Sequence, residues 1–197
     1  MSASRQPLSP TGELRLQLTK ADYEVIPLAG KRPVLDGWQK RGLATEHEIA
    51  MWDTFKAATN TGILTARTPV LDIDIRDPEA AEAVEQLVSE RFDDQNVLCR
   101  IGQAPKRAIL FQTTTPFSKI LVKFLAPNGA EHSLEFLAQG QQAVVYGIHP
   151  DTKQPYAWPH GELLEFRRDD LPGITPDGAQ ALVLAVTEML VREHHYA

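Results

Sequence analysis

Residues 70–75 read Val70-Leu71-Asp72-Ile73-Asp74-Ile75, an alternation of apolar and acidic residues that indicates a half-buried β-strand. Successive strand side chains point to opposite faces, so Asp72 and Asp74 share one face while their apolar neighbours enter the core. Two adjacent carboxylates repel each other unless a cation lies between them. Mg²⁺ or Mn²⁺ accepts such oxygen ligands and can bridge nucleotide phosphates. A solvated acidic strand would carry the same pattern, so the pair alone is weak evidence for a metal site.

Further strands are expected on both sides of this one. Upstream they cover residues 23–28 and 61–64, and downstream they cover residues 96–101, 107–112, 119–125, 131–137 and 142–146. Helices are predicted at 45–57, where Thr45 and Glu48 form a capping box, from Asp77-Pro78 to about residue 92, and at 176–193. The order of these elements predicts an α+β fold with a largely antiparallel sheet and helices packed on it.

Length and composition indicate one soluble globular unit of 197 residues, with 43% hydrophobic and 23% charged residues. We expect a disordered leader over residues 1–18, a catalytic domain over 19–172 and a C-terminal helix over 173–197. That helix is expected to link to further domains of a longer parent protein. No apolar run approaches the roughly 18 residues of a membrane span, and no signal peptide is evident, so we expect a cytoplasmic protein without membrane contact.

Charge is unevenly distributed along the chain. The net charge of −6 argues against nonspecific coating of DNA, because phosphate binding needs local positive charge. Residues 95–129, however, contain no Asp or Glu and hold five cations: Arg100, Lys106, Arg107, Lys119 and Lys123. This distribution permits a basic groove beside an acidic metal site. The single cysteine, Cys99, excludes an internal disulfide and a zinc cluster.

Two more segments offer candidate site residues. Ser133-Leu134-Glu135-Phe136-Leu137 is a strand with one acid between apolar neighbours. If this strand pairs beside the Asp72 strand, Glu135 becomes a third metal ligand, and otherwise it is a solvated glutamate. The loop over residues 146–158 is rich in Gly, Pro, Asp and Thr, and it holds His149 at a strand end, where the imidazole could donate to a phosphate or a ribose.

The order of these motifs resembles the archaeo-eukaryotic primase superfamily, and within it the bifunctional primase/polymerase N-terminal domain of phage, plasmid and prophage replication proteins. The resemblance runs from about residue 22 to 158. Its elements are Val25-Ile26-Pro27-Leu28 with Gly30-Lys31 and Gly37-Trp38, then Asn60-Thr61-Gly62-Ile63-Leu64-Thr65, the Asp72-Ile73-Asp74 strand, the Glu135 strand and the His149 loop. It implies a sheet like that of RNA-recognition domains with flanking helices, a smaller α/β module, and an active site in the cleft between them.

The chain departs from this family in its middle motif, where a nucleotide-binding histidine is common. Here the sequence is Ala104-Pro105-Lys106-Arg107-Ala108, and no histidine lies between His47 and His132. Lys106 and Arg107 could bind the triphosphate, His149 could enter the site from its loop, or polymerisation could be lost. Lys31 and Arg32 are candidates for template phosphates with Trp38 stacked on a base, although Trp38 in the core with solvated cations is equally compatible.

The resemblance implies template-directed nucleotidyl transfer with Mg²⁺ or Mn²⁺ held by Asp72, Asp74 and Glu135. Its partners would be a single-stranded DNA template, nucleoside triphosphates and a helicase region. One alternative is a noncatalytic module that binds nucleotide or single-stranded DNA. Another is a different metal-dependent enzyme, a glycosyltransferase or a nuclease, although a glycosyltransferase should show a longer parallel sheet upstream of the acidic pair.

Overall fold

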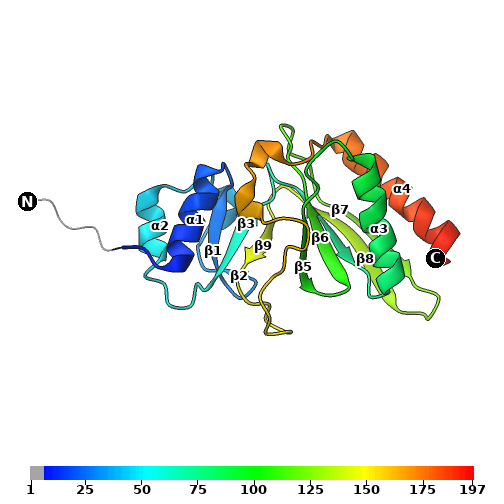
Figure 1. Ribbon diagram of the computed structural model, residues 1–197, viewed down its shortest axis with the longest axis horizontal. Helices are drawn as coiled ribbons and strands as arrows, with labels where there is room; N and C mark the ends of the chain where they lie inside the picture. The colour runs from blue at the N-terminus through cyan, green and yellow to red at the C-terminus, as the bar shows by residue number, and fades with distance from the viewer. Residues whose placement is uncertain (1–6) are drawn as a thin grey trace, which may run out of the picture.

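Two antiparallel sheets lie side by side in the computed structural model, which describes residues 7–197 (Figure 1). The larger sheet has the order β5-β6-β4-β8-β7, with β4 (Val70–Asp74), β5 (Cys99–Gln103), β6 (Lys106–Leu110), β7 (Ile120–Leu125) and β8 (Glu131–Leu137). The smaller sheet has the order β2-β1-β3-β9, with β1 (Val25–Ala29), β2 (Arg32–Pro33), β3 (Asn60–Leu64) and β9 (Gln142–Tyr146). The predicted mixture of helices and antiparallel strands is confirmed.

Two helices, α3 (Pro78–Arg91) and α4 (Pro176–His194), cover one face of the larger sheet (Figure 1). Leu71, Ile73 and Phe136 point to that side and are fully buried against the helices. The alternate residues of β4 therefore face the other way, toward the smaller sheet. Because α4 contributes Leu182, Val186 and Leu190 to this core, it is an integral part of the domain, and its role as a linker stays a prediction.

The smaller sheet packs one face against α1 (Pro10–Lys20) and α2 (Glu46–Trp52). Its other face carries a separate small apolar cluster of Ile26, Leu28, Leu64, Val144 and Tyr156. The chain crosses from β3 to β4 and returns from β8 to β9, and the two crossings are hydrogen-bonded, because Thr65 Oγ1 donates to the Ala138 carbonyl at 2.6 Å. The two sheets are thus one continuous structure.

The expected disordered leader is wrong for residues 10–18, which form most of α1. Ser9 caps this helix and Pro10 occupies its first turn, while Leu18 is buried. Arg15 is also buried, and its guanidinium donates to the carbonyls of Ala58 and Asn60 at 2.6 and 3.0 Å. Ser9 and Pro10 are therefore a helix start signal that the sequence analysis missed, and the contacts of Arg15 fix the helix against β3. Residues 1–6 of the expected leader lie outside the described residues.

The helix predicted over residues 45–57 is shorter than expected. The capping box of Thr45 and Glu48 is present, but α2 ends at Trp52. Residues 53–57 leave the helix in turns, in which the Phe55 amide donates to the Trp52 carbonyl. Phe55 is consequently 37% exposed instead of entering the core with Trp52.

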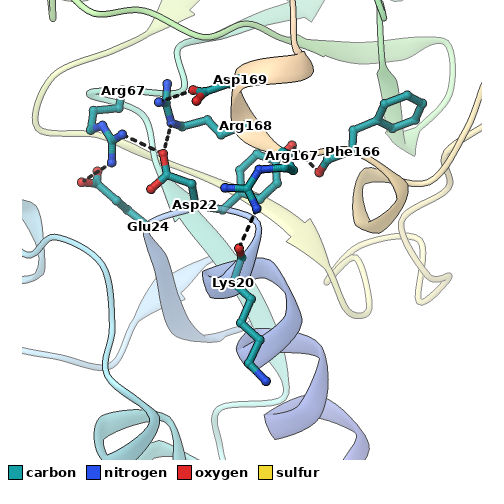
Figure 2. Close-up of polar contacts among 9 residues, drawn as sticks. Lys20, Asp22, Glu24, Arg67, Phe166, Arg167, Arg168 and Asp169 are labelled. Atoms are coloured by element: carbon teal, nitrogen blue, oxygen red, sulfur yellow. Dashed lines mark hydrogen bonds and ion pairs between the residues drawn. The ribbon is translucent and has the colours of Figure 1, made fainter.

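A network of ion pairs fixes the segment that returns from the smaller sheet to α4 (Figure 2). This segment includes two short 3₁₀ turns, η2 (Leu163–Glu165) and η3 (Arg168–Asp170), and a third such turn, η1 (Trp38–Lys40), follows β2. Asp22 Oδ2 accepts from Arg67 Nη2 and Arg168 Nε, each at 2.8 Å. Since Arg67 lies in the crossing from β3 to β4, the network joins that crossing, through Asp22, to the segment that leads from β9 to α4. No helix within residues 7–197 is long and apolar enough to cross a membrane.

Candidate active site

Three carboxylates share the face of the larger sheet that points away from α3 and α4. Asp72 of β4 pairs directly with Glu135 of β8, and Asp74 pairs with Ser133 in the same antiparallel register. Side chains of directly opposed residues lie on the same face with Cβ atoms roughly 5 Å apart. Asp72, Asp74 and Glu135 thus share one face of the sheet, and their role as ligands of a shared metal site stays a prediction.

Each carboxylate has a cationic neighbour in this structure. Lys106 Nζ lies 2.6 Å from Asp74 Oδ1, and Lys119 Nζ lies 2.6 Å from Glu135 Oε1. Throughout residues 7–197, no group of three or more His, Cys, Asp or Glu side chains is arranged to hold a metal ion. The oxygen donors nevertheless suit Mg²⁺ or Mn²⁺ chemically, and a bound divalent ion would replace the two ammonium groups as the partner of Asp74 and Glu135.

Asp72 and Asp74 line a pocket between the two sheets. Its cavity volume is about 200 Å³, and it is open to solvent. Besides Asp72 and Asp74, its charged and aromatic lining comes from several elements: Lys31, Arg100, Lys106, Arg107, His149 and Tyr156. Cations and carboxylates together suit a ligand that carries phosphates and binds with a divalent ion.

Burial changes the acidity of Asp72. Loss of hydration raises the pKa of its carboxyl group, and the neighbouring charges of Asp74 and Glu135 raise it further, while Arg100 lowers it. A cation in the pocket would relieve this electrostatic penalty. A bound cation would therefore interact favourably with the ionised carboxylate of Asp72.

Arg100 is a pocket residue that the sequence analysis did not select as a site residue. It lies in the same cross-strand row as the acids, because Arg100 pairs with Ala108 and Ala108 pairs with Asp72. Its Nη2 is 4.0 Å from Asp72 Oδ1, and its guanidinium carbon lies 4.9 Å from the Tyr156 ring centroid. The only signal in the sequence was its place in the acid-free stretch, and the pairing register was needed to assign its face.

Arg107, expected beside Lys106 at the triphosphate, has a different place. It pairs with Ile73 and so projects to the opposite face, where Nη1 contacts Glu85 of α3. Lys106, one residue earlier, faces the pocket and reaches Asp74. Neighbouring strand residues alternate between faces, so the Arg107 guanidinium lies away from the three carboxylates. Arg107 also borders the pocket, and its role in nucleotide binding stays a prediction.

His149 lines the pocket, as one of the sequence-based alternatives proposed. Its side chain is 4% exposed, and its ring packs edge-on against Tyr156 with centroids 5.4 Å apart. Nδ1 accepts from the backbone amides of Asp151 and Thr152, each at 3.3 Å, so the proton of the neutral ring is on Nε2. Burial, with the nearby charge of Lys31, lowers the pKa of His149.

Asn60 at the start of β3 fixes the His149 loop. Its amide nitrogen donates to the carbonyls of Gly30 and Ile148 at 3.0 and 2.8 Å, and its Oδ1 accepts from the Ile148 amide at 3.0 Å. Gly147 adopts a φ of +121°, and a Cβ there would lie 2.1 Å from Asn60 Oδ1. The close approach requires glycine and holds two pocket loops together through one side chain.

The proposed template residues lie on the smaller sheet. Lys31 lines the pocket, whereas Arg32 on β2 is exposed. Trp38 is half-buried and packs against the small apolar cluster that includes Tyr156. Contact of these residues with a DNA template stays a prediction.

Comparison with known families gives one result over most of the chain. The family described as bifunctional DNA primase/polymerase, N-terminal, matches residues 15–176, a span that includes every residue lining the pocket. None of the curated proteins matches the sequence.

Proposed function

The chain belongs to the bifunctional DNA primase/polymerase N-terminal family, and from this membership we propose that it joins nucleotides on a single-stranded DNA template in the pocket between its sheets. One observation carries the proposal. Asp72 and Glu135 are directly opposed on adjacent strands, with Asp74 on the same face, and all three lie beside a pocket lined by cations. Three carboxylates on one face are what a two-metal nucleotidyl transfer requires.

The proposed reaction is an in-line displacement without a covalent enzyme intermediate. The primer 3′ hydroxyl, or that of an initiating nucleotide, attacks the α-phosphorus of the incoming nucleotide, and pyrophosphate leaves. Asp72, Asp74 and Glu135 would hold Mg²⁺ or Mn²⁺, which when bound neutralises phosphate charge and lowers the pKa of the attacking hydroxyl.

The remaining pocket residues bind and orient the nucleotide. Lys106 faces the pocket beside Asp74 and is placed to compensate phosphate charge where the family commonly has a histidine. His149 presents Nε2–H as a neutral donor, because its Nδ1 is already occupied by two backbone amides. The neutral ring donates a hydrogen bond without adding charge.

A noncatalytic nucleotide-binding module is the second candidate. The ion pairs of Lys106 with Asp74 and of Lys119 with Glu135 favour it, because they satisfy two carboxylates without any metal. The two functions share a pocket and differ in whether a divalent ion displaces the lysines.

Template-dependent synthesis separates these candidates. The chain is incubated with a single-stranded template, labelled nucleoside triphosphates and Mn²⁺ or Mg²⁺, with parallel reactions containing a chelator or the Asp74→Asn variant. The proposal expects products that depend on template, metal and Asp74. Nucleotide binding without any product under these conditions would assign the chain to the noncatalytic class.

A further inference from the structure

Arg100 has more hydrogen-bond donors than protein partners. Its Nη1 donates to the Val144 carbonyl of β9, while its Nε is buried and has no hydrogen-bond partner among the residues that the structure describes. Nη2 approaches Asp72 at 4.0 Å, which is too long for a hydrogen bond. Buried donors without partners are rare in native proteins, so this guanidinium needs an explanation.

Its surroundings direct the guanidinium toward the pocket. Ala108 lies between Arg100 and Asp72 in the cross-strand row, so the two charged side chains share one face of the sheet. Tyr156 lies under the guanidinium plane at 4.9 Å, and the Tyr156 hydroxyl likewise has no partner in the described part of the chain. The arginine is therefore held by Val144 and Tyr156, and it also lines the pocket.

Arg100 also connects the two walls of the pocket. It extends from β5 of the larger sheet and bonds to β9 of the smaller sheet, and only 13% of its side chain is exposed. Lost hydration lowers its pKa, and the Asp72 charge opposes that effect. A desolvated guanidinium binds phosphate strongly, often through two parallel hydrogen bonds.

We infer that Arg100 is a phosphate-binding residue of the pocket, which together with Lys106 holds the phosphate tail of the nucleoside triphosphate. This inference rests on the proposed function, because it names the group that the nucleotide contacts. Arg100 takes the role that the sequence suggested for Arg107, whose guanidinium contacts Glu85 on the other face of the sheet. The contact is to phosphate and is independent of the base.

Arg107 provides a matched control for testing this role. Both arginines lie on neighbouring strands and border the pocket, and both side chains are 13% exposed, but the Arg100 guanidinium lies on the face of Asp72, whereas that of Arg107 contacts Glu85 on the opposite face. Equilibrium dissociation constants are measured for the full chain and for Arg100→Met, Arg100→Lys and Arg107→Met. The ligands are a nucleoside triphosphate, the corresponding nucleoside, and inorganic triphosphate.

The expected result is a selective loss. Arg100→Met should lower the affinity for the nucleoside triphosphate and for inorganic triphosphate by about 10- to 100-fold, which is the effect of losing a charge-assisted contact. Its affinity for the nucleoside should change by less than about twofold. The triphosphate affinity of Arg100→Lys should lie between those of the unaltered chain and Arg100→Met, because lysine keeps the charge without the planar guanidinium. Arg107→Met should bind all three ligands like the unaltered chain.

Several results would overturn the inference. Unchanged triphosphate affinity in Arg100→Met, or an equal loss for the nucleoside, would leave Arg100 with a structural role only. If Arg100→Met fails to fold, the inference is tested with Arg100→Lys, by the same ratio of triphosphate affinity to nucleoside affinity. If neither variant folds, the Arg100 Nε–H resonance of the unaltered chain must shift on addition of inorganic triphosphate, and an unchanged resonance contradicts the inference. An unaltered chain that binds nucleosides but no triphosphate would contradict both this inference and the proposed function.

Discussion

Asp72 and Glu135 are directly opposed on β4 and β8, so that two acidic side chains leave neighbouring antiparallel strands on the same face of the sheet. Like charges in this arrangement destabilise a sheet unless a cation compensates them. Lys119 Nζ lies 2.6 Å from Glu135 Oε1, whereas Arg100 Nη2, the cation beside Asp72, lies 4.0 Å from Asp72 Oδ1. Asp72 is thus the less compensated member of the pair.

Replacement of Asp72 by asparagine should remove activity without lowering the stability of the fold. The variant should lose nucleotide incorporation by more than about 100-fold, as expected when a metal ligand is removed. Its melting temperature should stay within about 3 °C of the unaltered chain or rise, because one of two repelling charges is gone. Activity assays and thermal unfolding of the same preparation test this. A melting temperature lowered by about 8 °C or more would indicate a structural role for Asp72.

Lys106 should contribute to nucleotide binding, in contrast to its neighbour Arg107. Loss of a charge-assisted phosphate contact of about 1.5–3 kcal/mol should raise the nucleotide KM of Lys106→Ala by about 10-fold or more. Lys123→Ala is the matched control, because Lys123 also pairs with a carboxylate, Glu131 at 2.8 Å, but does not line the pocket. Equal KM values for the two variants would exclude a phosphate contact by Lys106.

His149 should make the stability of the chain depend on pH below neutrality. Its folded pKa is lowered from 6.5 by burial, so the unfolded chain takes up the proton first as the pH falls. The stability contributed by the neutral ring is complete above pH 6.5 and is lost as the pH falls through the folded pKa. Thermal unfolding between pH 5 and 8 should show a weaker pH dependence in His149→Gln. His132, whose pKa burial also lowers, is replaced separately as a control.

Asn60 should position the His149 loop without touching the nucleotide. Asn60→Ala removes two donated bonds and one accepted bond between the Gly30 turn and Ile148, which should cost about 1–3 kcal/mol of unfolding free energy. The nucleotide KM should rise, because Lys31 and His149 lose their fixed separation. Denaturant unfolding and steady-state kinetics measure the two effects. A normal KM in a destabilised variant would limit Asn60 to a structural role.

The sequence was sufficient for elements whose pattern is local. Alternation over Val70–Asp74, the Asp77-Pro78 start of α3 and the apolar periodicity of α4 each predicted the observed element. It was insufficient where distant residues decide the structure. The helix α1 depends on Arg15 bonding to carbonyls near β3, and nothing within residues 10–20 announces those partners.

The candidate site likewise contains residues whose placement follows from a local pattern and residues whose placement depends on strand pairing. Asp72 and Asp74 share a face by strand geometry alone, so their placement could be predicted. The choice between Lys106 and Arg107, and the presence of Arg100 in the pocket, depend on the register of β6 against its neighbours. A shift of one residue would exchange the two faces, and no local pattern in this stretch specifies that register.

Template-directed incorporation by Glu135→Gln tests the central claim most directly. This variant keeps the size of the side chain and removes the charge that the account assigns to the metal site. Labelled nucleotide incorporation on a single-stranded template is measured in Mn²⁺ beside the unaltered chain, with circular dichroism to verify the fold. We predict synthesis by the unaltered chain and a loss of more than about 100-fold in Glu135→Gln. Synthesis by folded Glu135→Gln at the rate of the unaltered chain would contradict this prediction.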